Sequence, residues 1–252
     1  MRFRFKFVPF VATVAVVAAG LALGNWQRHR AEERTALGAR LAAGNAAAPL
    51  QLEAAGLRES APGTPGAALL SAAQAEFRRV RVSGQFVPGW PVYLDNRPYQ
   101  GRAGFYLLMP FTIAGSNMHV LVARGWLPRD PQQRDKLPAV ATPSGTVTLE
   151  GMARLNAGHV MQLGSAPALQ AGAIVQNADP AQVAAASGLA MQPWLIEQGG
   201  AAGPGDDAQL VRDWPAPELG VDKHRGYAFQ WYALAAMALI FFVWNGCRRG
   251  KQ

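Results

Sequence analysis

The sequence contains very little cysteine, since Cys247 is the only one among its 252 residues. A chain with one thiol cannot form an internal disulfide, a thiolate metal site, a thioredoxin-like pair or the Cys-x-x-Cys-His motif that attaches haem covalently. Copper delivery through cysteine ligands is excluded for the same reason.

The sequence also lacks the short motifs of the common enzyme classes. It has no Gly-x-Ser-x-Gly nucleophile turn, no phosphate-binding P-loop, no dinucleotide glycine fingerprint and no His-Glu-x-x-His zinc motif. The histidines are scattered between His29 and His224, and nothing assembles an acid–base pair. We expect no catalytic turnover, and an exported enzyme whose site forms only in the folded chain is the least favoured alternative.

Charged residues are scarce, at 16% of the chain, and the excess of positive charge is not evenly spread. Residues 25–226 hold 18 cations and all 16 acids, so the interior carries only +2 of the total +8. The other six cations lie before residue 7 or after residue 247: Arg2, Arg4, Lys6, Arg248, Arg249 and Lys251. This distribution indicates membrane-flanking ends and argues against a nucleic-acid partner.

Two long apolar runs lie next to these cations. Residues 7–23 have no formal charge over 17 positions, and residues 227–244 have only Gln230 as a strongly polar side chain over 18. As helices, each would span roughly 26 Å, close to the ~30 Å hydrocarbon thickness of a bilayer. Both runs therefore predict transmembrane helices. A cleaved secretory signal ending near Gly24 is the alternative for the first run, and either way the following residues are exported.

We expect both termini in the cytoplasm, because a long loop is translocated largely regardless of its charge. The expected division is a cytoplasmic segment at residues 1–6, a first span at 7–24, a periplasmic β-rich domain at 25–223, a second span at 224–245 and a cytoplasmic segment at 246–252. Residues 37–73, rich in Ala, Gly and Pro, are expected to form a flexible insert, as loops or short helices.

The intervening sequence has the pattern of short strands separated by Gly, Pro and Asn. The expected strands are residues 77–86, 92–94, 104–111, 119–126, 146–154 and 194–197. Residues 179–187 predict a helix that opens with Asp and Pro, and residues 157–173 and 199–208 predict loops. The fold class is thus a membrane protein of the α+β class, with two terminal transmembrane helices flanking an exported antiparallel sheet or partial barrel.

The entrance to the two spans is the most informative region. If the second helix extends back to residue 224, then His224, Tyr227 and Trp231 lie along one face at i, i+3 and i+7. Trp26 and Gln27 follow the first span. The simplest interpretation is an aromatic belt at headgroup level, a solvated imidazole, and glutamines that bond across the helices. The more specific one is a haem site, in which His224 ligates iron beside an aromatic wall and Arg225 or Arg30 pairs with propionates.

The ordered motifs of the chain resemble those of one family, and they cover most of its length. They are Leu23-Gly24-Asn25-Trp26-Gln27, Phe77-Arg78-Arg79-Val80, Gly84-Gln85-Phe86, Leu94-Asp95-Asn96-Arg97, Gly104-Phe105-Tyr106, Val120 to Pro128, Leu149-Glu150-Gly151 and His224-x-x-Tyr227-Ala228-Phe229-Gln230-Trp231-Tyr232. The chain resembles the Surfeit locus protein 1 family, membrane assembly factors of cytochrome c oxidase.

The resemblance implies a function in the maturation of oxidase subunit I in the bacterial inner membrane. It implies haem a as the cofactor, His224 as its iron ligand, and a binding region of Tyr227, Trp231, Trp26, Gln27 and Arg225. It also implies that the first helix is retained, and that the partners are subunit I, the bilayer and haem a synthase, with no nucleic acid. The alternative is a cofactor-free scaffold that stabilises an oxidase subunit.

Two motifs in the predicted strand region are explained by the fold without a functional role. Asp95-Asn96-Arg97 predicts a turn whose side chains bond to their own backbone, although partner binding stays an alternative. Arg124-Gly125-Trp126 predicts the end of a strand with Trp126 buried in the core.

Overall fold

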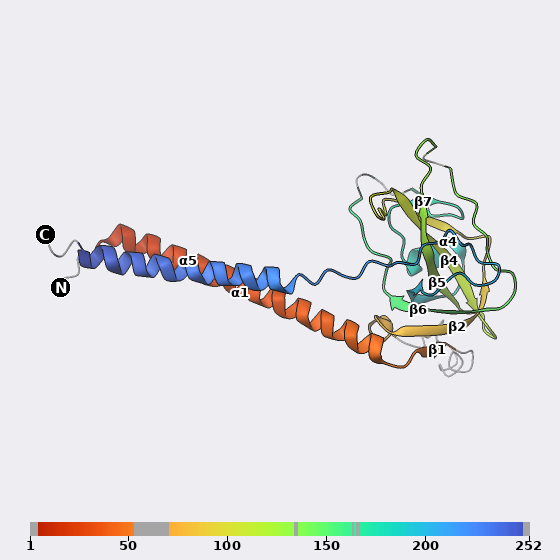
Figure 1. Ribbon diagram of the computed structural model, residues 1–252, viewed down its shortest axis with the longest axis horizontal. Coiled ribbons are helices and arrows are strands. Elements are labelled where there is room, and N and C mark those ends of the chain that lie inside the picture. The colour runs from red at the N-terminus through yellow and green to blue at the C-terminus, as the bar shows by residue number, and fades with distance from the viewer. Residues whose placement is uncertain (1–4, 53–70, 134–135, 163, 165–166, 249–252) are drawn as a thin grey trace. The chain divides into compact units, whose positions relative to one another are not determined.

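The computed structural model describes residues 5–52, 71–133, 136–162, 164 and 167–248 (Figure 1). The chain forms two compact units. The first comprises residues 1–42 and 216–252, and the second comprises residues 43–215. The first unit contains most of one long helix and all of another, and the second contains the sheet.

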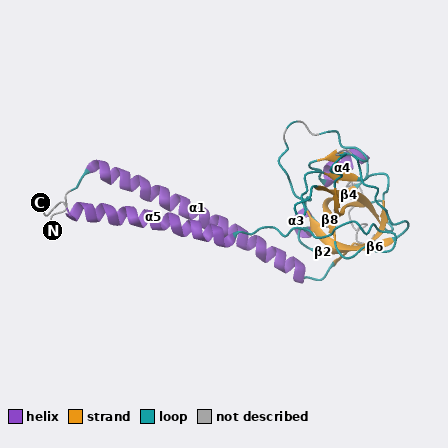
Figure 2. Cartoon of the chain, turned by 45° about the horizontal axis from the view of Figure 1, so that its top comes forward, coloured by secondary structure: helices purple, strands orange, loops and turns teal. Residues whose placement is uncertain are grey.

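The helical unit is formed by α1 (Phe7–Ala46) and α5 (Val221–Arg248), which run side by side in opposite directions (Figures 1 and 2). Each helix is long and apolar enough to cross a membrane by length and composition. α5 includes residue 224, as the spacing of His224, Tyr227 and Trp231 requires. The helix pair thus has the two apolar elements that the sequence predicts.

Small residues bring the two helices close together. Gly20, Gly24 and Ala31 are buried along one stripe of α1, and Ala228 and Ala235 are buried along α5. A Cβ added to Gly20 would lie 2.9 Å from the Cβ of Ala235, so the backbones approach as closely as glycine permits. Gly20 and Gly24 are four residues apart, the spacing that lets apolar helices associate without polar contacts.

α1 is longer than expected. The first span was expected to end at Gly24, with residues 37–73 in loops or short helices, but the helix continues to Ala46. The reason is that residues 25–46 contain no proline and many strong helix formers, mainly Ala, Arg and Glu. Of the expected insert, Leu50–Leu52 forms strand β1, Ala72–Ala75 forms helix α3, and residues 53–70 lie outside the described residues.

The second unit contains the strands, and the sequence locates most of them. After β1, the strands are β2 (Arg79–Phe86), β3 (Val92–Leu94), β4 (Gly104–Ile113), β5 (His119–Pro128), β6 (Val147–Arg154), β7 (Ile174–Val175) and β8 (Met191–Gln198). α4 (Pro180–Ser187) is capped by the side chain of Asp179, which accepts from the backbone N–H of Gln182 at 2.8 Å. β1 and β7, of three and two residues, were not predicted, whereas the equally short β3 was located just before the turn residues Asp95 to Pro98.

The strands close into a small barrel. In the described part of the chain their order is β1-β2-β6-β8-β5-β4-β3-β7, and β2 also pairs with β4, which closes a ring through β2, β6, β8, β5 and β4. Gly84 permits this closure, because a Cβ there would collide with the carbonyl oxygen of Thr112 on β4. Val80, Val82, Phe111 and Trp194 are buried in the cluster that fills the barrel.

The expectation of an antiparallel sheet is correct only in part. β1–β2, β3–β7 and β5–β8 pair in parallel, whereas the remaining pairs are antiparallel. β3 and β7, and β5 and β8, are not consecutive in the chain, whereas β1 and β2 are consecutive strands separated by residues 53–78. The intervening segment, which for β5 and β8 includes β6, β7 and α4, lets the chain return in the same direction.

Candidate functional site

His224 is held by a residue of the other helix. Its Nδ1 lies 2.7 Å from Oε1 of Gln27, and the imidazole is half-buried. An amide oxygen only accepts hydrogen bonds, so Nδ1 carries the proton and donates it. The Nε2 lone pair of the neutral ring is then left for another partner. Ligating histidines are commonly held in this way, with the second ring nitrogen bonded to a carbonyl or carboxylate oxygen.

A second hydrogen bond crosses the helix pair nearby. The hydroxyl of Tyr232 donates to Oδ1 of Asn25 at 2.7 Å. A Cβ added to Gly24 would lie 2.5 Å from the same tyrosine ring, so the glycine makes room for it. Gly24, Asn25 and Gln27 therefore each have a contact on α5. Tyr232 was not among the predicted site residues. Its place eight residues after His224, on the same side of the helix, was the available signal in the sequence.

The other predicted aromatic residues surround this contact unequally. Trp231 is half-buried in the helix interface, and its carbonyl oxygen lies 2.9 Å from where a Gly20 Cβ would be. Tyr227 and Trp26 are each 52% exposed. Within the described residues, the Trp26 ring contacts the guanidinium of Arg30, at 5.8 Å, and no ring of α5. Trp26 and Tyr227 thus lie on exposed parts of the helix pair, and the facing wall that Trp26 and Gln27 would form across a porphyrin stays a prediction.

The arginines expected to pair with propionates lie on exposed surfaces. Arg225 is 3.8 Å from Asp222 on the same helix, and Arg30 is 2.9 Å from Glu33. Exposed pairs of this kind contribute little, at most about 1 kcal/mol. An anionic ligand could therefore replace either carboxylate at small cost.

His224 is the single side chain of the helix contact that could ligate iron. Across the described ranges of the chain, no three His, Cys, Asp or Glu side chains converge on one point. A lone ion would therefore lack a protein ligand set, whereas a porphyrin supplies four nitrogens and needs only an axial ligand.

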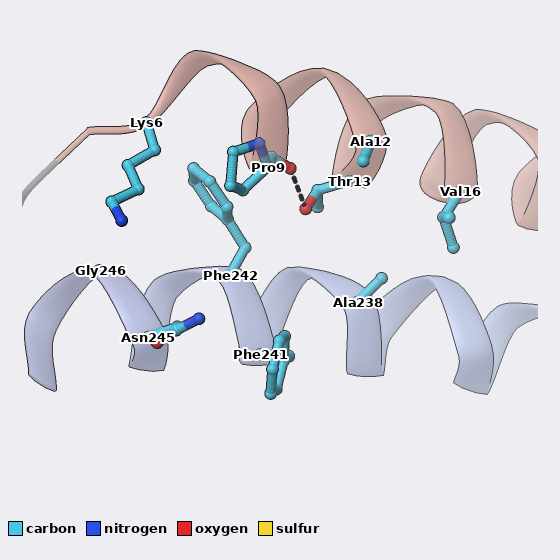
Figure 3. A pocket seen from close by; sticks show the side chains of 10 residues that line it. All are labelled: Lys6, Pro9, Ala12, Thr13, Val16, Ala238, Phe241, Phe242, Asn245 and Gly246. Atoms are coloured by element: carbon cyan, nitrogen blue, oxygen red, sulfur yellow. Dashed lines mark hydrogen bonds between the residues drawn. The ribbon is translucent and has the colours of Figure 1, made fainter. Parts of the chain in front are cut away.

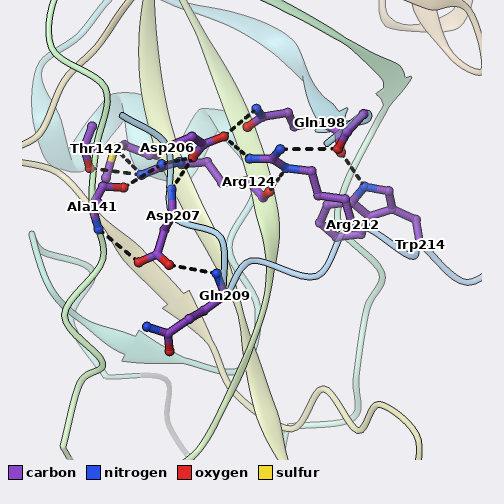
Figure 4. Close-up of polar contacts among 11 residues, drawn as sticks. Arg124, Ala141, Thr142, Gln198, Asp206, Asp207, Gln209, Arg212 and Trp214 are labelled. Atoms are coloured by element: carbon purple, nitrogen blue, oxygen red, sulfur yellow. Dashed lines mark hydrogen bonds and ion pairs between the residues drawn. The ribbon is translucent and has the colours of Figure 1, made fainter. Parts of the chain in front are cut away.

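The β-rich unit contains a buried charge network that the sequence analysis did not identify (Figure 4). Arg124 is fully buried and donates to Oδ1 of Asp206 at 2.6 Å, to Thr142 and to the carbonyl of Ala141. Arg212 pairs with the other oxygen of Asp206 and donates to the carbonyl of Arg124. The network ties the segment after β8 to the barrel.

The burial of this network shifts its pKa values. Desolvation lowers the pKa of Arg124, although Asp206 opposes the shift. Desolvation would raise the pKa of Asp206, but the hydrogen bonds and charges of Arg212 and Arg124 outweigh it and hold that pKa below its usual range. Burial and ion pairing thus act in opposite directions on the pKa of Arg124 and on that of Asp206. A β-bulge in the β4–β5 pair helps to place Arg124. Ala123 pairs with Leu108 and Gly125 pairs with Leu107, so Arg124 has no partner residue on β4 and is the extra residue of the bulge.

Two sequence interpretations are tested in the same unit. Trp126 is 4% exposed and its Nε1 donates to the carbonyl of Arg97, which confirms the core assignment. Asn96 has a positive φ of 58°, typical of a turn. The expectation that the turn's side chains bond to their own backbone is wrong, because Asp95 accepts from Arg129, and Arg97 donates to carbonyls at residues 158 and 176. Because Arg97 is buried, its guanidinium contacts the loops that contain residues 158 and 176 and not its own turn.

Comparison with known proteins identifies the family. The SURF1 family model matches residues 14–236, a range that includes both halves of the His224–Gln27 contact. Uncharacterized SURF1-like proteins of Mycobacterium bovis and of two Mycobacterium tuberculosis strains are 30% identical to this chain over 194 residues. The match covers 72% of the chain and 65% of each relative, slightly under two thirds of their length. The chain therefore belongs to the SURF1 family.

Proposed function

We propose that this chain is an assembly factor for cytochrome c oxidase that holds haem a beside the helix pair and passes it to oxidase subunit I. Membership of the SURF1 family supports the assembly function. The observation that carries the haem proposal is the 2.7 Å contact between His224 and Gln27, which leaves Nε2 as the free ring nitrogen. In this proposal haem a is cargo and the chain performs no catalytic turnover.

The surroundings of His224 favour a transient carrier over a permanent haem protein. The imidazole is half-buried, and Tyr227, Trp26 and Arg225 are exposed beside it. Aromatic side chains at an exposed surface can cover one face of a porphyrin, and Arg225 can pair with a propionate. A ligand that is only partly enclosed leaves more readily than one buried on all sides, as delivery to subunit I requires. Haem a synthase is the proposed supplier.

The two apolar helices support placement in the bacterial inner membrane. We propose that both α1 and α5 span the bilayer, with the barrel in the periplasm and both ends of the chain in the cytoplasm. Under this topology His224 and Gln27 lie at the periplasmic edge of the spans. A periplasm-dependent reporter fused after Gln252 should be inactive, and an active fusion would contradict the topology.

The test of the haem proposal is spectroscopic. The full-length protein would be purified in detergent from a host that makes haem a, and the Soret band would be compared with that of His224→Ala. His29→Ala is the matched control, because His29 is an exposed histidine close to Gln27 on α1. We expect His224→Ala to lose the band and His29→Ala to keep it. A wild-type protein without pigment, or an unchanged band in His224→Ala, would refute the haem site.

The alternative is a cofactor-free scaffold that stabilises an oxidase subunit, and one observation favours it. Gly24, Asn25 and Gln27 all contact α5, so helix packing alone accounts for much of this motif. Under the scaffold proposal, His224→Ala should support oxidase maturation as well as the parent, provided that the variant is present in equal amount. Under the haem proposal it should not.

A further inference from the structure

A cavity of about 350 Å³ lies between α1 and α5 at the end of the helix pair opposite His224 (Figure 3). Its walls come from the first turns of α1 and the last turns of α5. Ala12, Ala238 and Gly246 line it, and these side chains are too small to fill the space between the helices. The volume is within the range of ligand pockets, about 300 to 1,000 Å³.

The walls of the cavity are apolar along most of its length. The one hydroxyl among the lining residues belongs to Thr13, and it donates to the carbonyl of Pro9 at 2.8 Å, so it is already satisfied by the helix backbone. The rings of Phe10 and Phe242 meet at 5.9 Å and hold the two helices together at this end. A hydrocarbon chain would lose no hydrogen bonds by entering.

Positive charge lies at one end of this apolar space. Lys6 precedes the first turn of α1 and its side chain extends toward α5, while the amide of Asn245 lines the same end (Figure 3). Among the residues that the structure describes, none that lines the cavity is a carboxylate, and the first turn of α1 contains no acid. The N-terminal end of the α1 dipole adds to the positive potential at this end. An occupant with an apolar body and an anionic head fits this arrangement.

We infer that the cavity binds an anionic phospholipid, with an acyl chain between the helices and the phosphate at Lys6. The inference depends on the membrane placement proposed above but not on haem binding. The sequence holds five more cations in residues 1–4 and 248–251. Basic pockets between spans on the cytoplasmic side are typical sites for such lipids. An apolar helix of another protein would fill the cavity but would not place an anionic group at Lys6.

The test uses the full-length chain purified in detergent from a host that makes no haem a. It would be titrated with phosphatidylglycerol or with phosphatidylcholine of the same acyl chains, and bound lipid counted by native mass spectrometry. We expect the chain to prefer phosphatidylglycerol. Lys6→Gln should weaken phosphatidylglycerol binding about fivefold, since one juxtamembrane cation contributes about that factor. Lys223→Gln, at the other end of α5, should leave it unchanged.

A second pair of variants tests the acyl-chain part of the inference. Ala238→Phe fills the cavity from α5 and Ala12→Leu fills it from α1. Each variant should therefore weaken the binding of phosphatidylglycerol and of phosphatidylcholine by the same factor. Equal binding of the two lipids by the parent chain, or unchanged binding by Lys6→Gln, would overturn the inference. A photocrosslinking group placed at Val16 that reacts with a protein helix and not with lipid would also overturn the inference. His224→Ala from the same host should bind phosphatidylglycerol as the parent chain does, because the lipid site is independent of the haem site; weaker binding by this variant would contradict that independence.

Discussion

Replacing Gln27 by Leu tests the link between the observed contact and the proposed function most directly. The change removes the oxygen that accepts the Nδ1 proton of His224 at 2.7 Å and retains a side chain of similar volume. The imidazole then loses the partner that fixes its tautomer and ring orientation. Loss of such a partner typically lowers metal affinity by about 10 to 100-fold. The corresponding binding free energy is about 1.4 to 2.8 kcal/mol.

The assay is a haem titration of the purified full-length protein, followed by the growth of the Soret band. Asn25→Leu is the matched control, because it removes a cross-helix hydrogen bond of the same length, from Tyr232, at a neighbouring position. We expect a tenfold or greater weakening for Gln27→Leu and little change for Asn25→Leu. Gln27→Glu keeps an acceptor and should restore binding to the level of the parent chain.

Two results would refute this reasoning. If Gln27→Leu binds haem as tightly as the parent, then the contact with His224 only packs the helices. If Asn25→Leu weakens binding as much as Gln27→Leu, then helix association explains both effects and the orientation of the imidazole does not matter.

Three predictions concern stability. Asp206→Ala leaves two buried guanidiniums without their carboxylate and should cost about 3 to 5 kcal/mol in urea unfolding of the β-rich unit; a cost below about 1 kcal/mol would mean that water replaces the carboxylate. Burial raises the pKa of Glu197 from 4.5 to about 7, so between these pH values the folded state binds a proton that the unfolded state does not. The free energy of unfolding should therefore fall as the pH rises from 4.5 to about 7. Glu197→Gln should flatten this pH dependence, and an unchanged slope in the variant would refute the role of Glu197. Gly24→Ala should displace the ring of Tyr232 and lower the thermal midpoint in detergent, since overpacking costs about 1 to 3 kcal/mol; Gly226→Ala, which meets nothing within 4 Å, should not, and equal effects would contradict the packing argument.

Local sequence signals located most elements of the barrel. Val80 and Val82 alternate with arginines in β2, and both valines are buried while the arginines face outward. Asp179 and Pro180 mark the start of α4 because one caps the helix with its side chain and the other cannot donate a backbone hydrogen bond in its first turn. Such signals depend on neighbours within a few positions, so the sequence contains them in full.

The candidate site was predictable as a set of residues but not as a geometry. The spacing of His224, Tyr227 and Trp231 on one helix follows from 3.6 residues per turn. The helical repeat does not predict that Gln27 accepts a hydrogen bond from His224 or that Asn25 accepts one from Tyr232, because these pairs lie 197 and 207 positions apart in the sequence. Their contacts depend on how closely Gly20 and Gly24 let the two helices approach.

The amino-acid sequence alone determined the two apolar helices, the order of the longer strands and the family resemblance, because each of these depends on short-range pattern or on motif order. Only the tertiary structure decided the parallel pairing of β5 with β8, the closure of the barrel through β2 and β4, and the burial of Arg124 against Asp206. These features join segments that meet only when the chain folds, and their free energy comes from desolvation and packing that no local window of sequence contains.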